Sequence, residues 1–373
     1  MKKVLLGFIA IATFSVFLSC ETKENDPDAG YGILPEKFTV DVPGSLSYGD
    51  FKSTSGDTLL GNEIYANLKL FIAVGEGAAQ IVEDIMFAIK AYNIEKVQEV
   101  TFLSDDDDRV KHLTVLNDVE AEGKNWEYKL TLTDLESENN EDGGIGMQVF
   151  WNNNPVEGIA ILKPYNIDRI SDGEAREALY KIEYTSASTD TYDETMMVEI
   201  ADIPLDEADE YSLQSMKMFV GKKGNIVDVF GNSNHPNAQF NDSDADAVGF
   251  NWAFVASADE NKNIAVAEVG LPPSNLDSSS RNEILIKYSI QNVLTNEITN
   301  FLLAEYPNLI GVDITPYIAP YLTNTEDPGF FDAQGFVQAE VAPNTDYATI
   351  ENRILTLSPF MPAEVSSLEI SFE

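Results

Sequence analysis

Cysteine, histidine and basic residues are scarce in this chain of 373 residues, which has one cysteine and two histidines. One cysteine cannot form a disulfide bridge within the chain, and two histidines cannot make a three-histidine metal site. Lys and Arg number 23 against 63 Asp and Glu, which gives a formal net charge of −40. Because phosphate contacts need clusters of Lys and Arg, this balance argues against binding to nucleic acid and to anionic membrane surfaces.

Sequence motifs of several enzyme classes are missing as well. The chain has no Gly-x-Ser-x-Gly turn to present a serine nucleophile and no Gly-x-x-x-x-Gly-Lys-[Ser/Thr] loop to hold a phosphate. No Rossmann fingerprint follows a predicted strand, so no cofactor is predicted. The sequence therefore favours a non-enzymatic protein and leaves enzymatic activity open.

The content of apolar residues is ordinary for a folded protein. Hydrophobic residues make up 44% of the chain and aromatic residues 10%, which is enough to build a full core. The length suits two domains or one large β-rich domain.

The amino terminus has the pattern of a secretory signal peptide. Lys2 and Lys3 precede an apolar run over residues 4–18, and the run ends at Ser19 and Cys20. This run of fifteen residues is too short to span a bilayer as a helix, which needs about 20 residues. The sequence predicts a signal peptide over residues 1–19.

The end of this run, Phe17-Leu18-Ser19-Cys20, resembles a bacterial lipobox. The resemblance implies that Cys20 is lipid-modified and becomes the first residue of the mature chain. Phe17 and Leu18 depart from the usual Leu followed by a small residue, whereas Ser19 and Cys20 fit. The alternative is a plain secretory signal with an incidental cysteine.

Residues 20–36 read as a lipidated cysteine followed by a flexible, acidic tether, because they are polar and lack periodicity. This stretch is similar to those that follow the lipidated cysteine in Bacteroidota outer-membrane lipoproteins. The resemblance implies an outer-membrane protein held by lipid at its periplasmic or surface-exposed face. The alternative is a solvated linker without a targeting role.

The rest of the chain, residues 37–373, is predicted to be an α+β region dominated by strands. Alternating apolar and polar residues predict a meander of about ten or eleven strands in a large, curved, mostly antiparallel sheet, half-barrel or sandwich-like, packed by a few helices. A Pro- and Ser-rich stretch near residues 271–280 marks a sub-boundary. The predicted strands lie at residues 97–102, 110–116, 126–132, 145–151, 159–162, 180–184, 196–200, 216–220, 226–230, 250–254 and 264–269.

Helical spacing occurs in two places. Residues 64–89 predict a pair of helices interrupted at Gly75-Glu76-Gly77, and residues 285–302 predict a helix capped by Ser280 and ended by Pro307. Residues 311–344 read as loops with short elements, and the alternation over residues 368–372 predicts a closing strand.

A few residues stand out as candidates for chemistry. His235 lies in a polar stretch at the end of a predicted hairpin, where it can serve as a functional imidazole or simply make hydrogen bonds. Asp242, Asp244 and Asp246 have the spacing of a calcium loop, but Ala247 replaces the essential Gly, so only a weak surface Ca²⁺ site stays open.

Three tryptophans and an acidic run are expected to be structural. Trp126, Trp151 and Trp252 lie in alternating apolar registers and are predicted to be core residues. The four aspartates at residues 105–108 are predicted to form a solvated loop between strands.

These features favour a membrane-anchored, extracytoplasmic lipoprotein that binds an apolar ligand or a partner protein, such as an outer-membrane protein. The alternative is a secreted hydrolase of glycans or esters that uses carboxylates or His235. A hydrolase should have a cleft in which such groups converge, and a carrier should have an apolar cavity between sheet and helices.

Overall fold

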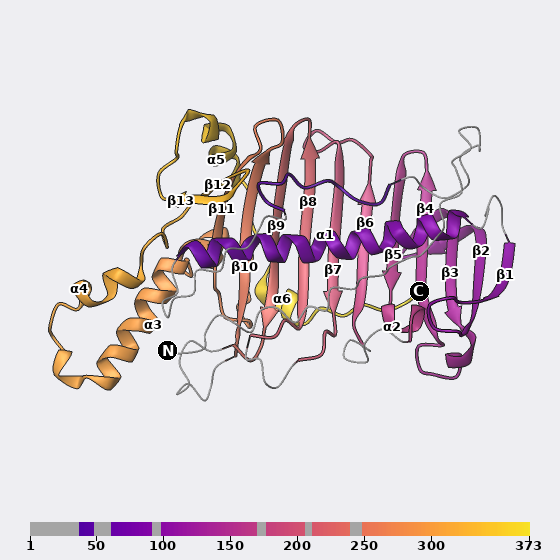
Figure 1. Ribbon diagram of the computed structural model, residues 1–373, viewed down its shortest axis with the longest axis horizontal. Coiled ribbons are helices and arrows are strands. Elements are labelled where there is room, and N and C mark those ends of the chain that lie inside the picture. Colours follow the sequence, from indigo (N-terminus) through magenta and orange to yellow (C-terminus); the bar gives the residue numbers. More distant parts are fainter. Residues whose placement is uncertain (1–36, 48–60, 92–97, 170–176, 206–210, 239–247) are drawn as a thin grey trace.

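A computed structural model describes residues 37–47, 61–91, 98–169, 177–205, 211–238 and 248–373. They form a single antiparallel sheet of thirteen strands, in which each strand pairs with its neighbours in the sequence (Figure 1). The order runs from β1 to β13 without closing on itself, so the sheet is open. The predicted α+β class with one large antiparallel sheet is confirmed.

The strands follow the predicted positions closely, and all eleven predicted strands are present as β1 to β11. The strand bounds are β1 (Gln98–Leu103), β2 (Val110–Ala121), β3 (Lys124–Asp134), β4 (Ile145–Asn153), β5 (Val156–Leu162), β6 (Leu179–Thr185), β7 (Glu194–Ala201), β8 (Ser215–Lys223), β9 (Ile226–His235), β10 (Phe250–Asp259), β11 (Ile264–Gly270), β12 (Gly329–Asp332) and β13 (Gly335–Ala339).

The helices are fewer and mostly short, apart from two. Their bounds are α1 (Gly61–Ala91), α2 (Pro164–Ile167), α3 (Ile290–Glu305), α4 (Thr315–Ile318), α5 (Ala348–Ile354) and α6 (Pro362–Ser366), with a π-helical turn at Asn282–Ile286 and 3-10 turns at Leu135–Ser137, Pro307–Leu309, Ala319–Tyr321 and Thr345–Tyr347.

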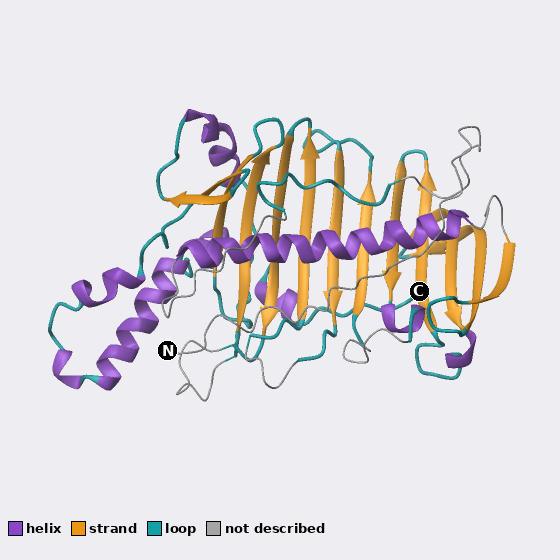
Figure 2. Ribbon diagram, in the orientation of Figure 1, coloured by secondary structure: helices purple, strands orange, loops and turns teal. Residues whose placement is uncertain are grey.

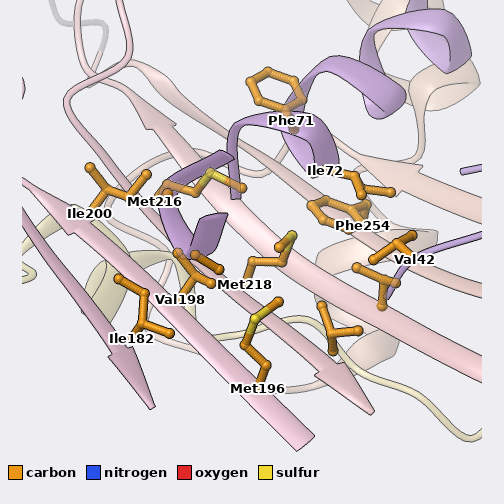
Figure 3. Close-up of a cluster of buried hydrophobic side chains, with 14 of the residues drawn as sticks. Val42, Phe71, Ile72, Ile182, Met196, Val198, Ile200, Met216, Met218 and Phe254 are labelled. Carbon is orange, nitrogen blue, oxygen red and sulfur yellow. The ribbon is translucent and has the colours of Figure 1, made fainter. Parts of the chain in front are cut away.

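Helix α1 is one continuous helix that lies across one face of the sheet (Figure 2). The predicted interruption at Gly75-Glu76-Gly77 is wrong, because Gly75 serves close packing instead. A Cβ on Gly75 would overlap the terminal methyl group of Met218 and lie 2.9 Å from its Sδ. The glycine therefore lets the helix approach β8, and the buried core around this contact includes Ile72, Val198 and Met218 (Figure 3).

The segment of residues 37–47 lies beside α1 on the same face. Phe38 N–H donates to Glu83 Oε1 at 2.8 Å, and Lys69 Nζ donates to the Gly44 carbonyl oxygen at 3.2 Å. These contacts pair the start of the segment with the later part of α1 and its end with the earlier part. The helix and the segment together cover the largest hydrophobic core.

The carboxy-terminal residues 348–373 cover the opposite face. Ala253 and Val255 alternate with core residues facing α1 and pack with Ile350 and Ile354 of α5. The predicted closing strand over residues 368–372 is wrong, because this stretch has no regular structure and lies against the sheet through its apolar side chains. Its alternation reflects packing on a face and not pairing at an edge.

Side-chain amides of the sheet satisfy the backbone of this carboxy-terminal segment. Asn232 accepts from the Phe360 N–H at 2.9 Å and donates to the Phe360 carbonyl oxygen at 3.1 Å. Gln148 makes the same reciprocal pair with Glu373, at 2.8 and 2.9 Å. A segment without a strand partner needs such bonds, because unpaired buried backbone groups are costly.

Replacing Asn232 with alanine is expected to lower the free energy of unfolding by about 1–3 kcal/mol, because the Phe360 backbone loses both partners. Urea unfolding followed by tryptophan fluorescence measures this. Asn352→Ala is the control, since that amide bonds only the Ala348 carbonyl on an exposed helix surface. Equal losses in the two variants would contradict the role given to Asn232.

The stretch at residues 271–280 does not divide the sheet, because β12 pairs with β11 and continues it. The helix expected after Ser280 is split. A π-helical turn covers Asn282–Ile286, and α3 begins only at Ile290. Ser289 caps α3 by accepting from the Asn292 N–H, so the cap lies nine residues beyond the predicted one.

Candidate functional site

Four of the predicted site residues lie outside the described part of the chain. Cys20, the predicted lipidation site, precedes residue 37, and Asp242, Asp244 and Asp246 fall between residues 238 and 248. Lipidation of Cys20 and the weak surface Ca²⁺ site therefore stay predictions. Among the described residues, no group of three or more His, Cys, Asp or Glu side chains is placed to hold a metal ion.

His235 is a buried residue at the end of β9, and not an exposed turn residue. Its Nδ1 lies 2.9 Å from the Tyr211 carbonyl oxygen and its Nε2 lies 2.9 Å from Ser233 Oγ. The ring packs against Phe71 and Phe250. Burial lowers the pKa of His235 to about 4, so the ring is neutral, Nδ1 donates to Tyr211 and Nε2 accepts from Ser233. The pair resembles an activated serine, yet both side chains are shielded from solvent.

The acidic turn at residues 105–108 is only partly solvated. Asp107 is buried, and its Oδ2 accepts from Lys111 Nζ at 2.7 Å and from the Arg169 N–H at 3.1 Å. The expectation of a wholly solvated loop is therefore wrong for Asp107. The three tryptophans, in contrast, are buried as predicted.

Asp134 lies at the centre of the same cluster, which fastens the ends of β2, β3 and β4. Its carboxylate accepts from Arg109 Nε at 2.8 Å, from Arg169 Nε at 3.3 Å and from Ser137 Oγ at 3.1 Å. Burial opposes ionisation, but the Arg109 hydrogen bond and the Lys111 charge outweigh it and lower the pKa of Asp134. Because its cations are paired within the cluster, we assign it a structural role.

The segment of residues 290–322 projects from the rest of the protein and is named here the projecting hairpin. It contains α3 and α4, which contact each other, and extends beyond the sheet near β11 to β13 (Figure 1). The hairpin is attached to the largest hydrophobic core through the buried side chains of Ile290, Val293 and Leu294. Between Leu294 and Ile318, a stretch that the structure describes throughout, no residue is buried.

The tip of the projecting hairpin, residues 306–317, is apolar and open to solvent. Tyr306, Ile310, Val312 and Tyr317 are 54%, 71%, 49% and 56% exposed, respectively. Asp313 is the one charged residue in the tip, and its Oδ1 accepts from the Thr315 N–H at 3.0 Å at the start of α4. A cluster of large exposed apolar side chains on a single projection is typical of an interaction site.

The base of the projecting hairpin is fastened to α1 through Tyr65. The Tyr65 phenol oxygen lies 2.9 Å from the Glu326 carbonyl oxygen and 2.7 Å from Asp327 Oδ1. Gln291 Nε2 of α3 donates to Glu326 Oε1 at 3.3 Å. The Tyr65 ring also stacks on Phe336 with centroids 5.0 Å apart. These contacts hold the two chain ends of the hairpin against the sheet.

Asp327 is protonated in this arrangement below about pH 7. The Tyr65 hydroxyl donates to Asp327 Oδ1, and the Val269 N–H also bonds this carboxyl group, so both contacts lower its pKa. Burial, together with the charge of Glu268, raises the pKa of Asp327 to about 7. Burial likewise raises the pKa of Glu268, although that carboxylate is ion-paired with Arg281. The cluster is therefore a closed, buried fastening and offers no accessible catalytic group.

Sequence reasoning missed both parts of this site. Residues 311–317 of the tip lie in a stretch predicted to be loops, and the signal of the tip was the run of Tyr, Pro, Ile and Val with one charge among twelve residues. Nothing in the sequence linked Tyr65 with Asp327, because 262 positions separate them.

Comparison of the chain with protein-family models, with characterised proteins and with solved structures finds no match. No described helix combines the length and the apolar character needed to span a bilayer. The function is therefore argued from the residues and their geometry.

Proposed function

We propose that this protein is a membrane-anchored, extracytoplasmic lipoprotein that works by binding and surface assembly. The proposal for the anchor is supported by the basic start, the apolar run and Cys20 at its end. The observation that carries the binding role is the projecting hairpin, whose apolar tip is exposed on an otherwise acidic protein.

An apolar ligand held between α1 and the sheet has little support. The interface is closely packed where Gly75 meets Met218, and side chains such as Ile72 and Val198 fill the space around it (Figure 3). The tip of the projecting hairpin is a more accessible apolar surface. Binding through this exterior surface therefore agrees better with the geometry than the carrying of a ligand inside.

The hydrolase alternative gains no support from His235, because the side chains of His235 and Ser233 are buried beneath α1. The pair of perturbed carboxyl groups at the base of the hairpin, Asp327 and Glu268, is also buried and is engaged by Tyr65 and Arg281. We therefore propose no second function.

Replacing Cys20 with alanine is expected to abolish acylation and to release the protein from the membrane fraction, because no other thiol exists in the chain. Labelling with a radioactive fatty acid and fractionation of the cells measure both effects. Ser19→Ala is the matched control, since it keeps a small residue before the cysteine. Membrane retention of the Cys20 variant, or a mature chain that starts elsewhere, would refute the anchor.

A further inference from the structure

We propose that the tip of the projecting hairpin, residues 306–317, seats in the neutral part of the membrane–water interface and thereby orients the protein on the bilayer. This inference rests on the anchoring of Cys20 proposed above. It assigns the exposed apolar tip one occupant, the lipid interface, in preference to a partner protein.

The size of the apolar surface favours a lipid interface. At about 150 Å² for each side chain, the lower end of the aromatic range, the exposed parts of Tyr306, Ile310, Val312 and Tyr317 total roughly 350 Å². A standard protein interface needs about 800 Å² from each partner. Insertion into lipid has no such threshold, because a covalent anchor nearby holds the tip at a high effective concentration.

The charge of the hairpin favours the same occupant. No Lys or Arg occurs between Lys287 and Arg353, so the hairpin has no cation to contact an anionic headgroup. The tip also carries a single acid, Asp313, in a chain whose net charge is −40. A tip with a single charge can enter a lipid interface more readily than the strongly acidic rest of the surface.

The types of residue at the tip match the chemistry of that interface. Tyr306 and Tyr317 flank the more apolar Ile310 and Val312 along the chain. Tyrosine is enriched at the level of lipid headgroups, because its ring is apolar and its hydroxyl group is polar. The aliphatic side chains between the two tyrosines would reach the beginning of the acyl region.

The length of chain after Cys20 limits how far the body can lie from the anchor. Sixteen residues separate Cys20 from the first described residue, and at about 3.6 Å each they reach at most ~60 Å. A single point of attachment at Cys20 does not by itself set the orientation of the body. The hairpin, fastened at its base by Tyr65, would fix one orientation.

The single cysteine of the chain makes a direct test available. An Ile310→Cys variant, purified from cells and labelled with the fluorophore NBD maleimide, is reconstituted in phosphatidylcholine vesicles. A lipid attached through the Cys20 sulfur blocks that thiol, so one dye per chain reports acylation. The matched control is Leu355→Cys, an apolar residue of similar exposure (59%) that follows α5.

We expect one dye per chain and a blue-shifted, brighter emission at position 310 on vesicles, with no shift at position 355. One dye per chain without a shift at position 310 would overturn the membrane role of the tip and leave it to a protein partner. Two dyes per chain would show that Cys20 is not acylated and would overturn the anchor and this inference together. A shift that requires added phosphatidylglycerol would also overturn the inference, because the tip has no cations.

Discussion

Replacing Asp327 with asparagine is expected to stabilise the protein by about 2–4 kcal/mol at pH 8, and by progressively less as the pH falls toward 4. The introduced amide would keep an acceptor for the Tyr65 hydroxyl but could not ionise. Urea unfolding at several pH values, followed by tryptophan fluorescence, gives the free energies. The difference in unfolding free energy between the variant and the unchanged protein isolates the contribution of this carboxyl group. Other titrating groups, such as Glu76 on α1, contribute equally to both proteins.

The direction of this pH dependence follows from the raised pKa of Asp327. Between its ordinary value of 3.8 and its folded value of about 7, Asp327 holds a proton in the folded state that it lacks in the unfolded state. The stability that this proton provides is complete below the ordinary pKa and is lost as the pH rises through about 7. Burial and the charge of Glu268 raise the pKa of Asp327, and they outweigh the Tyr65 and Val269 hydrogen bonds and the charge of Arg281, which lower it.

Tyr65→Phe is the matched control for this prediction. It removes the phenol that bonds Glu326 and Asp327 but keeps the ring that stacks on Phe336. We expect it to be destabilising by about 1–3 kcal/mol at pH 5, where the hydrogen bonds are complete. If Asp327→Asn is equally destabilising at pH 5 and pH 8, the carboxyl group is ionised in the folded protein and the proposed fastening is wrong.

Replacing Asp134 with alanine is expected to lower the free energy of unfolding by about 3 kcal/mol at pH 7. The substitution leaves Arg109 and Arg169 without their shared buried carboxylate. Loss of one partner of a buried ion pair costs about 3–5 kcal/mol, and the partial exposure of both arginines places the effect at the lower end. Urea unfolding measures the change.

An exposed ion pair provides the contrast for Asp134. Asp346 Oδ1 accepts from Lys262 Nζ at 3.0 Å, and both side chains face solvent. Asp346→Ala is expected to cost less than about 1 kcal/mol, because water replaces the lost partner and salt screens the charges. If the Asp134 variant loses no more stability than the Asp346 variant, the buried cluster does not fasten β2, β3 and β4.

The strands were predictable because their signal is local. Trp126, Tyr128 and Leu130 alternate with polar residues, and the pairing of Leu130 with Val149 joins strands β3 and β4, which are consecutive in the sequence. The missed pair β12 and β13 is short, and β12 obtains its place by pairing with β11 across the whole of the projecting hairpin. No local sequence pattern indicates a strand partner that lies so far away in the sequence.

The errors have the same origin. Gly75 looks like a break in a helix when read alone, and only its contact with Met218 shows that it permits close packing. The alternation at Leu368 and Ile370 is real, but the segment packs on a face of the sheet and not at an edge. His235 looks like a loop residue because its neighbours are polar, whereas Phe71 of α1 covers it.

By itself, the sequence determined the class of fold, because the spacing of apolar residues sets which side of each strand is buried. It also determined the net charge, and it supports the prediction of an anchor at Cys20. Only the tertiary structure decided that residues 306–317 form an exposed apolar tip and that the Tyr65 hydroxyl bonds Asp327 at the base of the hairpin. Exposure and pKa depend on which distant residues exclude water, and that is a property of the folded chain.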